Sequence, residues 1–196
     1  MEVTAQAIQE LRTLTGAGIM DIKKALVESN GNTEAAIKLL REQGKLKALK
    51  KQERETKEGI IEAYIHANSQ VGSMIELNCE TDFVARNKEF QELAHNIVLQ
   101  VAALNPQYIA PEDVPQEVIE REKMIYQKQL EKEKKPANVL EKIIIGKLEK
   151  FFSEVCLVKQ KFFKDEKITI EELITSKIGA LGENIQVRRI VRMSIK

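Results

Sequence analysis

Apolar residues recur at intervals of three or four along the first part of the chain, which is the spacing of a buried helix face. The segments "AIQELRTL", "IMDIKKAL" and "TEAAIKLL" carry this pattern, and the turn-forming stretches "TGAG" and "NGN" separate them. Asn32 or Thr33 is placed to cap the third segment, and Gly44 is expected to end it. The pattern predicts three short helices between residues 4 and 44, packed as a small unit.

The stretch that follows, "KLKALKKQERETK" from Lys45 to Lys57, has six basic residues, two glutamates and few apolar positions. This composition is typical of a solvated helical linker. Contact with nucleic acid is the alternative, but no aromatic side chains that could stack on bases interleave the charges. We therefore place a domain boundary here, with residues 1–55 as the helical unit with its linker and residues 56–196 as the core.

Alternation with a period of two replaces the helical pattern after Gly59. Ile61, Ala63 and Ile65 occupy alternate positions, "ANSQVG" supplies turn residues, and a second alternating run ends at Cys79. This arrangement predicts a β-hairpin. The last segment, "NIQVRRIVRMSI", alternates in the same way and predicts a third strand with one basic, mostly exposed face.

The helical period returns between the hairpin and the last strand. Asn87 is placed to cap a helix whose apolar stripe runs from Phe90 to Val101, and the proline-rich "LNPQYIAPEDVP" after it is expected to be irregular. Residues 116–135 predict a largely exposed helix that Pro136 ends. The apolar segment "VLEKIIIGKLEKFFSEV" predicts a core helix, and "ITIEELITSKIGAL" a further helix. The fold class is α+β: a helical N-terminal unit, then a small antiparallel sheet packed against helices.

The charges of the chain are nearly balanced. Its 196 residues include 31 basic and 30 acidic side chains, so no global field attracts nucleic acid. No apolar run approaches the roughly 18 residues of a membrane span, and the N-terminal stretch is expected to be an amphipathic helix and not a leader. A cytosolic location without direct nucleic-acid or membrane contact is expected. Cys79 and Cys156 lie among aliphatic neighbours, and we interpret them as buried thiols and not as a disulfide or metal-ligand pair.

No group of residues in the sequence has the spacing of a catalytic or metal site. The "GAG" of the first turn follows a helix and lacks the spacing of a phosphate-binding loop, so a turn between helices is the better interpretation. His66 and His95 have no catalytic or metal partner at a recognisable spacing. Adjacent carboxylates such as Glu171 and Glu172 do not face one another on a helix. We expect a protein that is not an enzyme and that holds no cofactor and no metal.

One short motif joins the predicted hairpin to the helix after it. "NCETDFVARNKEF", from Asn78 to Phe90, places a carboxylate and a large apolar ring side by side, as Asp82 and Phe83. Two interpretations of the ring are open. It can fold back as a core residue that anchors the start of the helix, or it can be held out for a partner. Spacing alone does not decide between them.

Three separated stretches resemble the bacterial elongation factor Ts family: "LRTLTGAGIMDIKKAL", "ELNCETDFVARNKEF" and "GENIQVRRIVRM". Their order and spacing are similar to those of the family across essentially the whole chain. The resemblance implies a ubiquitin-associated-like three-helix N-terminal domain and an α+β core that makes most of the partner interface. It also implies a guanine-nucleotide exchange factor that binds elongation factor Tu, both GDP-bound and nucleotide-free, and promotes GDP release during translation elongation.

The resemblance further implies which residues contact this partner. In the family, the aromatic side chain of the "TDFVARN" motif intrudes between two helices of the partner's nucleotide-binding domain, and the acid beside it helps to disturb the magnesium and phosphate end of that site. The matching residues here are Phe83 and Asp82. The other partner-binding residues implied are Thr81, Val84, Arg86 and Asn87 in the same motif, and Gly16, Gly18, Met20, Asp21, Lys23 and Lys24 in the N-terminal domain.

The chain resembles the short form of the family, without a second sheet-containing half of the core and without a helical-hairpin insertion. In the family, a second copy can supply the missing half, which implies a homodimer. The exposed edge of a three-stranded sheet also favours self-association, and because the final strand has no cysteine we expect a non-covalent dimer. The alternative function is a scaffolding adaptor, in which the three-helix module binds ubiquitin-like or helical ligands and the rest of the chain is a dimerisation domain.

Overall fold

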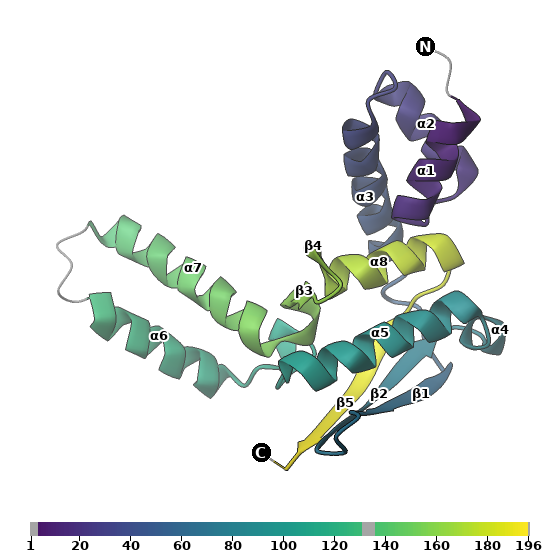
Figure 1. The fold of residues 1–196 in the computed structure, drawn as a ribbon. Coiled ribbons are helices and arrows are strands. Elements are labelled where there is room, and N and C mark those ends of the chain that lie inside the picture. Colours follow the sequence, from purple (N-terminus) through teal and green to yellow (C-terminus); the bar gives the residue numbers. More distant parts are fainter. Residues whose placement is uncertain (1–3, 131–135, 196) are drawn as a thin grey trace.

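The computed structural model describes residues 4–130 and 136–195 and confirms the α+β class. The molecule consists of a three-helix unit, a small sheet backed by helices, and a helical arm that projects from the sheet region (Figure 1). None of the described helices is long and apolar enough to cross a membrane.

The N-terminal unit is built from α1 (Ala5–Thr15), α2 (Ile19–Glu28) and α3 (Thr33–Leu49). Asn32 caps α3, because its side chain accepts a hydrogen bond from the backbone N–H of Ala35 at 3.0 Å. The expectation that Gly44 ends this helix is wrong. Burial of Ala48 in the main core draws the helix onward and outweighs the cost of about 1 kcal/mol for a glycine inside a helix. One helix thus spans the N-terminal unit and the core, and residues 45–49 of the predicted helical linker belong to it.

The main sheet is antiparallel, with strand order β1 (Glu58–Ile65), β2 (Val71–Cys79) and β5 (Gln186–Ser194). Two helices, α5 (Lys88–Leu104) and α8 (Ile170–Leu181), pack together, and α5 covers the inner face of the sheet (Figure 1). The predicted stripe from Phe90 to Val101 is buried there, and Asn87 caps α5 through the N–H of Glu89 at 2.8 Å, as the sequence pattern indicates.

A β-bulge changes which side of β5 faces the core. Arg188 is an extra residue opposite the Glu76–Leu77 step of β2. Beyond the bulge Ile190 packs on the core, whereas Val191 and Met193 are exposed. The expectation of one basic exposed face along the whole strand is therefore wrong, because the outer face is apolar in the second half of β5.

Two helices form the projecting arm, α6 (Gln116–Leu130) and α7 (Ala137–Val155), which lie side by side (Figure 1). Among the described side chains of α7, only Leu148 is buried. Two expectations are therefore wrong: α7 is not a core helix, because its apolar stripe packs partly on α6, and the chain does contain a helical hairpin. The predicted continuation of the first arm helix to residue 135 lies outside the described residues.

A second, two-stranded sheet is formed by β3 (Lys161–Phe162) and β4 (Asp165–Thr169). Strands this short show no period in the sequence, so the pattern does not predict them. The buried side chain of Gln100, on α5, fixes this hairpin: its amide donates to the carbonyl of Lys161 at 2.9 Å and its oxygen accepts from the N–H of Phe163 at 3.0 Å.

Candidate interaction site

The "NCETDFVARNKEF" motif forms a tight bend between β2 and α5. A single helical turn, α4 (Asp82–Ala85), lies within it, and the Thr81 hydroxyl caps that turn by accepting from the N–H of Val84 at 3.5 Å. Cys79 donates its S–H to the carbonyl of Thr81 at 3.1 Å. Asn87 then starts α5. Capping interactions thus fix the bend at both ends.

Phe83 points away from the core. Successive residues of a helix lie on different sides, so one turn cannot bury all of its side chains against one surface. Ala85 is buried and Val84 packs on the core, which leaves Phe83 on the outer side. Phe83 is 81% exposed, the largest exposed fraction among the large apolar residues that the structure describes. This geometry favours a ring held out for a partner over a core anchor.

Asp82 and Arg86 flank Phe83 on the same turn. They form an ion pair at 3.0 Å one helical turn apart, and both side chains are exposed. A surface pair of this kind contributes between zero and about 1 kcal/mol to stability. Both charges therefore remain free to exchange their mutual contact for contacts with a partner.

The predicted residues of the N-terminal unit lie at the start of α2. Met20, Lys23 and Lys24 are exposed and line one side of a shallow groove on that helix. Gly18 begins α2, and Asp21 lies in its first turn. The groove therefore combines apolar groups of Met20 and Val27 with two ammonium groups and the carboxylate of Glu28.

Gly16 has a structural role in the same region. It ends α1 in the left-handed region, at a φ of 65°, which an L side chain rarely adopts. A Cβ atom at Gly16 would lie 3.9 Å from that of Ala180, so the turn after α1 approaches α8 closely. The two predicted sets of residues form separate surfaces, one at the start of α5 and one beyond α8 (Figure 1), and not one pocket.

A contact to the bend from a distant segment has no local signal in the sequence. Glu183, in the turn between α8 and β5, accepts hydrogen bonds from the N–H groups of Glu80 and Thr81. It lies 102 residues from Thr81, so no local spacing indicates the contact. The sequence shows only a carboxylate directly after the glycine that ends a helix.

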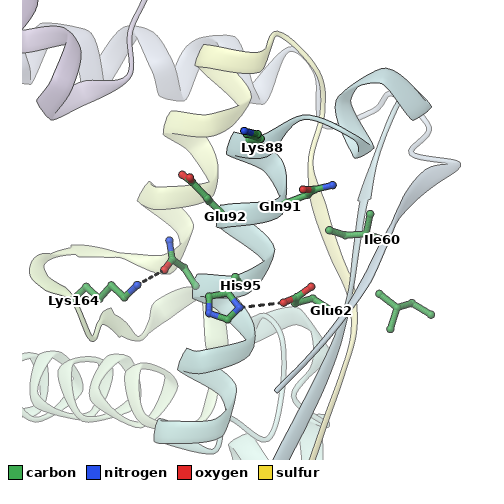
Figure 2. Close-up of a pocket in the computed structure, with 9 residues that line it drawn as sticks. Ile60, Glu62, Lys88, Gln91, Glu92, His95 and Lys164 are labelled. Atoms are coloured by element: carbon green, nitrogen blue, oxygen red, sulfur yellow. Dashed lines mark hydrogen bonds and ion pairs between the residues drawn. The ribbon is translucent and has the colours of Figure 1, made fainter. Parts of the chain in front are cut away.

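An open hollow of about 760 Å³ lies along α5 beside the edge strand β1 (Figure 2). His95 contacts Glu62 across it at 3.1 Å, and Lys164 donates to Asn96 at 2.7 Å. Its lining mixes both charge signs without the apolar enclosure of a small-molecule site. Within the described part of the chain, no group of three or more His, Cys, Asp or Glu side chains could hold a metal ion.

Other candidate catalytic groups have structural partners. His66 contacts the hydroxyl of Tyr64 at 2.8 Å. Glu171 pairs with Lys159 at 2.7 Å, and Glu172 accepts from the N–H of Thr169 in the capping box of α8. These contacts give Glu171 and Glu172 structural roles on helix α8.

Both cysteines are buried free thiols, which confirms the interpretation of the sequence. Burial, with nearby carboxylates as a second cause, raises the pKa of Cys156 to about 11. Burial, with the carboxylate of Glu183 as a second cause, raises the pKa of Cys79 to about 11. The thiolate is the nucleophilic form, so neither group is a nucleophile at neutral pH.

Comparison with known proteins identifies the family. A family model described as "Elongation factor TS" matches residues 2–178. The chain is 56% identical over 195 residues to the elongation factor Ts of Thermodesulfovibrio yellowstonii, with 100% of this chain and 97% of that protein covered. It is 53% identical over 195 residues to the elongation factor Ts of Fervidobacterium nodosum, covering 100% and 99%. With Carboxydothermus hydrogenoformans elongation factor Ts the identity is 52% over 193 residues, covering 98% and 89%. Because these matches extend over nearly the whole of each chain, the protein belongs to the elongation factor Ts family.

Proposed function

We propose that this protein is a guanine-nucleotide exchange factor that binds elongation factor Tu, in its GDP-bound and nucleotide-free forms, and promotes GDP release during translation elongation. One observation carries the proposal: in a chain of the elongation factor Ts family, an exposed Phe83 stands on a bend that is capped at both ends. The protein acts in the cytosol. Exchange makes and breaks no covalent bond, so the protein is not an enzyme in the chemical sense and needs no cofactor of its own.

The thermodynamic requirement is a difference in affinity. The factor must bind nucleotide-free partner more tightly than nucleotide-bound partner, because only a differential affinity shifts an equilibrium. Linkage makes this coupling reciprocal, so nucleotide displaces the factor to the same extent that the factor displaces nucleotide. Either GDP or GTP can therefore complete the cycle.

Phe83 acts more by displacing parts of the partner than by contributing binding free energy. Burial of one phenylalanine side chain is worth about 1.5–3 kcal/mol, whereas a nucleotide held near 1 nM corresponds to about 12 kcal/mol. The ring therefore acts by separating partner elements that hold the phosphates and Mg²⁺. Asp82 beside it adds a carboxylate that competes with the partner's own ligands for the cation. The remaining energy must come from a broad interface of at least about 1,000 Å².

The groove on α2 is the second part of this interface. Exposed Met20 offers a flexible apolar contact, and Lys23 and Lys24 offer positive charge to acidic groups of a partner. Its separation from Phe83 supports a partner that spans both surfaces. The ubiquitin-associated-like character of this three-helix unit stays a prediction.

The outer face of the main sheet supports a homodimer. The helices pack on the inner face, and the outer face has exposed apolar side chains from all three strands or their ends: Ile61, Ile65, Met74, Val191, Met193 and Ile195. An exposed apolar patch of this kind is typical of an association surface. Because both cysteines are buried inside the protein, association of two copies is non-covalent.

The test of the exchange function is the release of a fluorescent GDP from elongation factor Tu, followed in the presence of excess unlabelled GDP. Addition of this protein is expected to raise the release rate at substoichiometric concentration. Lack of acceleration would reject the exchange function and favour the alternative, a scaffolding adaptor whose α2 groove binds a helical ligand.

A further inference from the structure

The turn after α8 holds the bend that presents Phe83. One carboxylate oxygen of Glu183 accepts hydrogen bonds from the backbone N–H groups of Glu80 and Thr81, at 3.1 and 3.0 Å. The other oxygen accepts from the Thr81 hydroxyl at 2.6 Å. One side chain thus satisfies three donors of a distant segment, and bonds to a charged acceptor are the stronger kind.

This turn is itself firmly held. The N–H of Asn184 donates to the carboxylate of Glu80 at 2.7 Å, so the two segments bind one another reciprocally. The buried side-chain amide of Asn184 donates to the carbonyl of Arg54 at 2.9 Å. Lys51 donates to the carbonyl of Gly182 at 2.6 Å. Glu183 therefore acts from a fixed position and not from a loose loop.

The two ends of α4 are held in different ways. Val84 and Ala85 anchor the later residues of this turn to the core. The earlier residues, which include Phe83, depend on the N-cap at Thr81. The Thr81 hydroxyl has one proton, and its bond to Glu183 leaves the oxygen lone pairs to accept from the N–H of Val84. A single turn of helix is too short to hold its own direction without such support.

We infer that Glu183 is a positioning residue, which fixes the Glu80–Thr81 bend so that Phe83 is presented to the partner in one orientation. This role rests on the proposed exchange function. It differs from a contact role, because Glu183 acts through the backbone of another segment. It also differs from a general folding role, because its three bonds converge on two residues of the bend.

Two substitutions separate the hydrogen bonds from the size of the side chain. Glu183→Met keeps a similar volume but removes the acceptors. Glu183→Gln is the conservative replacement, because its amide oxygen accepts both N–H groups and its NH2 donates to the Thr81 hydroxyl. Glu171→Met is the matched control, since it removes an exposed carboxylate of α8 that pairs with Lys159 away from the bend. All are full-length chains, tested with elongation factor Tu loaded with fluorescent GDP.

We expect Glu183→Met to lower the maximal rate of GDP release about tenfold or more, with a smaller change in the concentration that gives half the maximal rate. Hydrogen exchange at the amides of Glu80 and Thr81 is expected to become about tenfold faster or more, with little change in α5. Glu183→Gln should remain within about threefold of the wild type in both measurements, and Glu171→Met should match the wild type.

Unchanged amide exchange in Glu183→Met would overturn the inference, as would faster amide exchange with a normal maximal rate. If Glu183→Met does not fold, Glu183→Asp replaces it: the shorter side chain keeps the charge but withdraws the acceptors by one methylene group, and an unchanged rate would again reject positioning. Failure of the wild type to accelerate GDP release overturns the proposed function itself, whereas a normal wild type with a normal Glu183→Met variant overturns only the role of Glu183.

Discussion

Phe83 and Phe90 lie seven positions apart in one motif and at opposite extremes of burial: Phe83 is 81% exposed and Phe90 is 0% exposed. The break at Asn87 causes the difference, because it ends the direction of α4 and starts α5 with a new one. Phe90 begins the buried stripe of α5, whereas Phe83 stands on the outer side of a turn that packs on the core through Val84 and Ala85. The core therefore needs only one of these two rings.

Phe83→Ala is expected to abolish most of the accelerated GDP release while it changes the free energy of unfolding by no more than about 0.5 kcal/mol, as for other exposed positions. Phe90→Ala is the matched control, since removal of a buried phenylalanine side chain costs about 3–5 kcal/mol. Thermal unfolding and fluorescent GDP release measure the two effects. A Phe83→Ala protein that is strongly destabilised but exchanges GDP normally would show that the ring serves the fold.

Asp82→Ala is expected to have a smaller effect on GDP release than Phe83→Ala, and the effect should depend on magnesium concentration. The reason is that a carboxylate near the partner's cation matters most when Mg²⁺ is abundant and holds the phosphates. Release rates measured across a magnesium titration check this expectation. A loss that is equal at every magnesium concentration would contradict the role assigned to Asp82, and Arg86→Ala controls for loss of the Asp82–Arg86 ion pair.

Val191→Glu is expected to shift the protein from dimer to monomer, because it places a charge on the apolar outer face of the sheet, opposite Met74 of the central strand. Sedimentation velocity across a concentration series measures the change. Met124→Glu serves as the control, since it alters an equally exposed apolar residue on the arm. An unchanged sedimentation coefficient in Val191→Glu, or a wild-type protein that sediments as a monomer, would place association elsewhere or exclude it.

The two thiols are expected to resist alkylation in the folded protein. A pKa of about 11 for Cys79 and Cys156, against an ordinary value of 9.0, lowers the thiolate fraction near pH 8 about a hundredfold. Iodoacetamide labelling with and without denaturant, followed by mass spectrometry, tests this. Rapid labelling of either residue without denaturant would show that the thiol is accessible and ionised.

The same shifts predict how stability depends on pH. Because the folded state holds these protons more tightly than the unfolded state, the contribution of the neutral thiols is fully present below about pH 9. It is lost as pH rises from about 9 to 11. Denaturant unfolding at a series of pH values is expected to show a fall in the free energy of unfolding over this window, and Cys156→Ser should reduce its pH dependence.

Local patterns predicted the parts of the fold whose neighbours in sequence are also neighbours in space. The β1–β2 hairpin and the caps at Asn32 and Asn87 depend on a few adjacent residues, and the structure confirms them. The prediction that α3 ends at Gly44 was wrong because the helix continues through the burial of Ala48 against the core. This contact exists only in the folded chain. Local chemistry favoured a stop, and tertiary packing outweighed it.

Two further errors have the same cause. The apolar stripe of α7 shows that this helix packs against another element, but it does not show which one. The sequence pattern therefore could not distinguish α6 from the sheet as the partner of α7. In β5, the extra residue Arg188 reverses the alternation, and only the pairing with β2 reveals it. At the candidate site, the motif indicated Asp82 and Phe83, whereas the contact from Glu183 crosses 102 residues and has no local pattern.

The base of the arm is closed by a parallel bridge between Tyr108 and Cys156. The N–H of Tyr108 donates to the carbonyl of Val155, and the N–H of Leu157 donates to the carbonyl of Tyr108, at 3.0 and 2.9 Å. The chain thus leaves the body of the protein and returns to it at one point, the Tyr108–Cys156 bridge, which we call the clasp. The reach of the arm is therefore independent of the rest of the architecture: helical turns can be added or removed beyond the clasp, in matched pairs, while every strand and the bend that bears Phe83 keep their places.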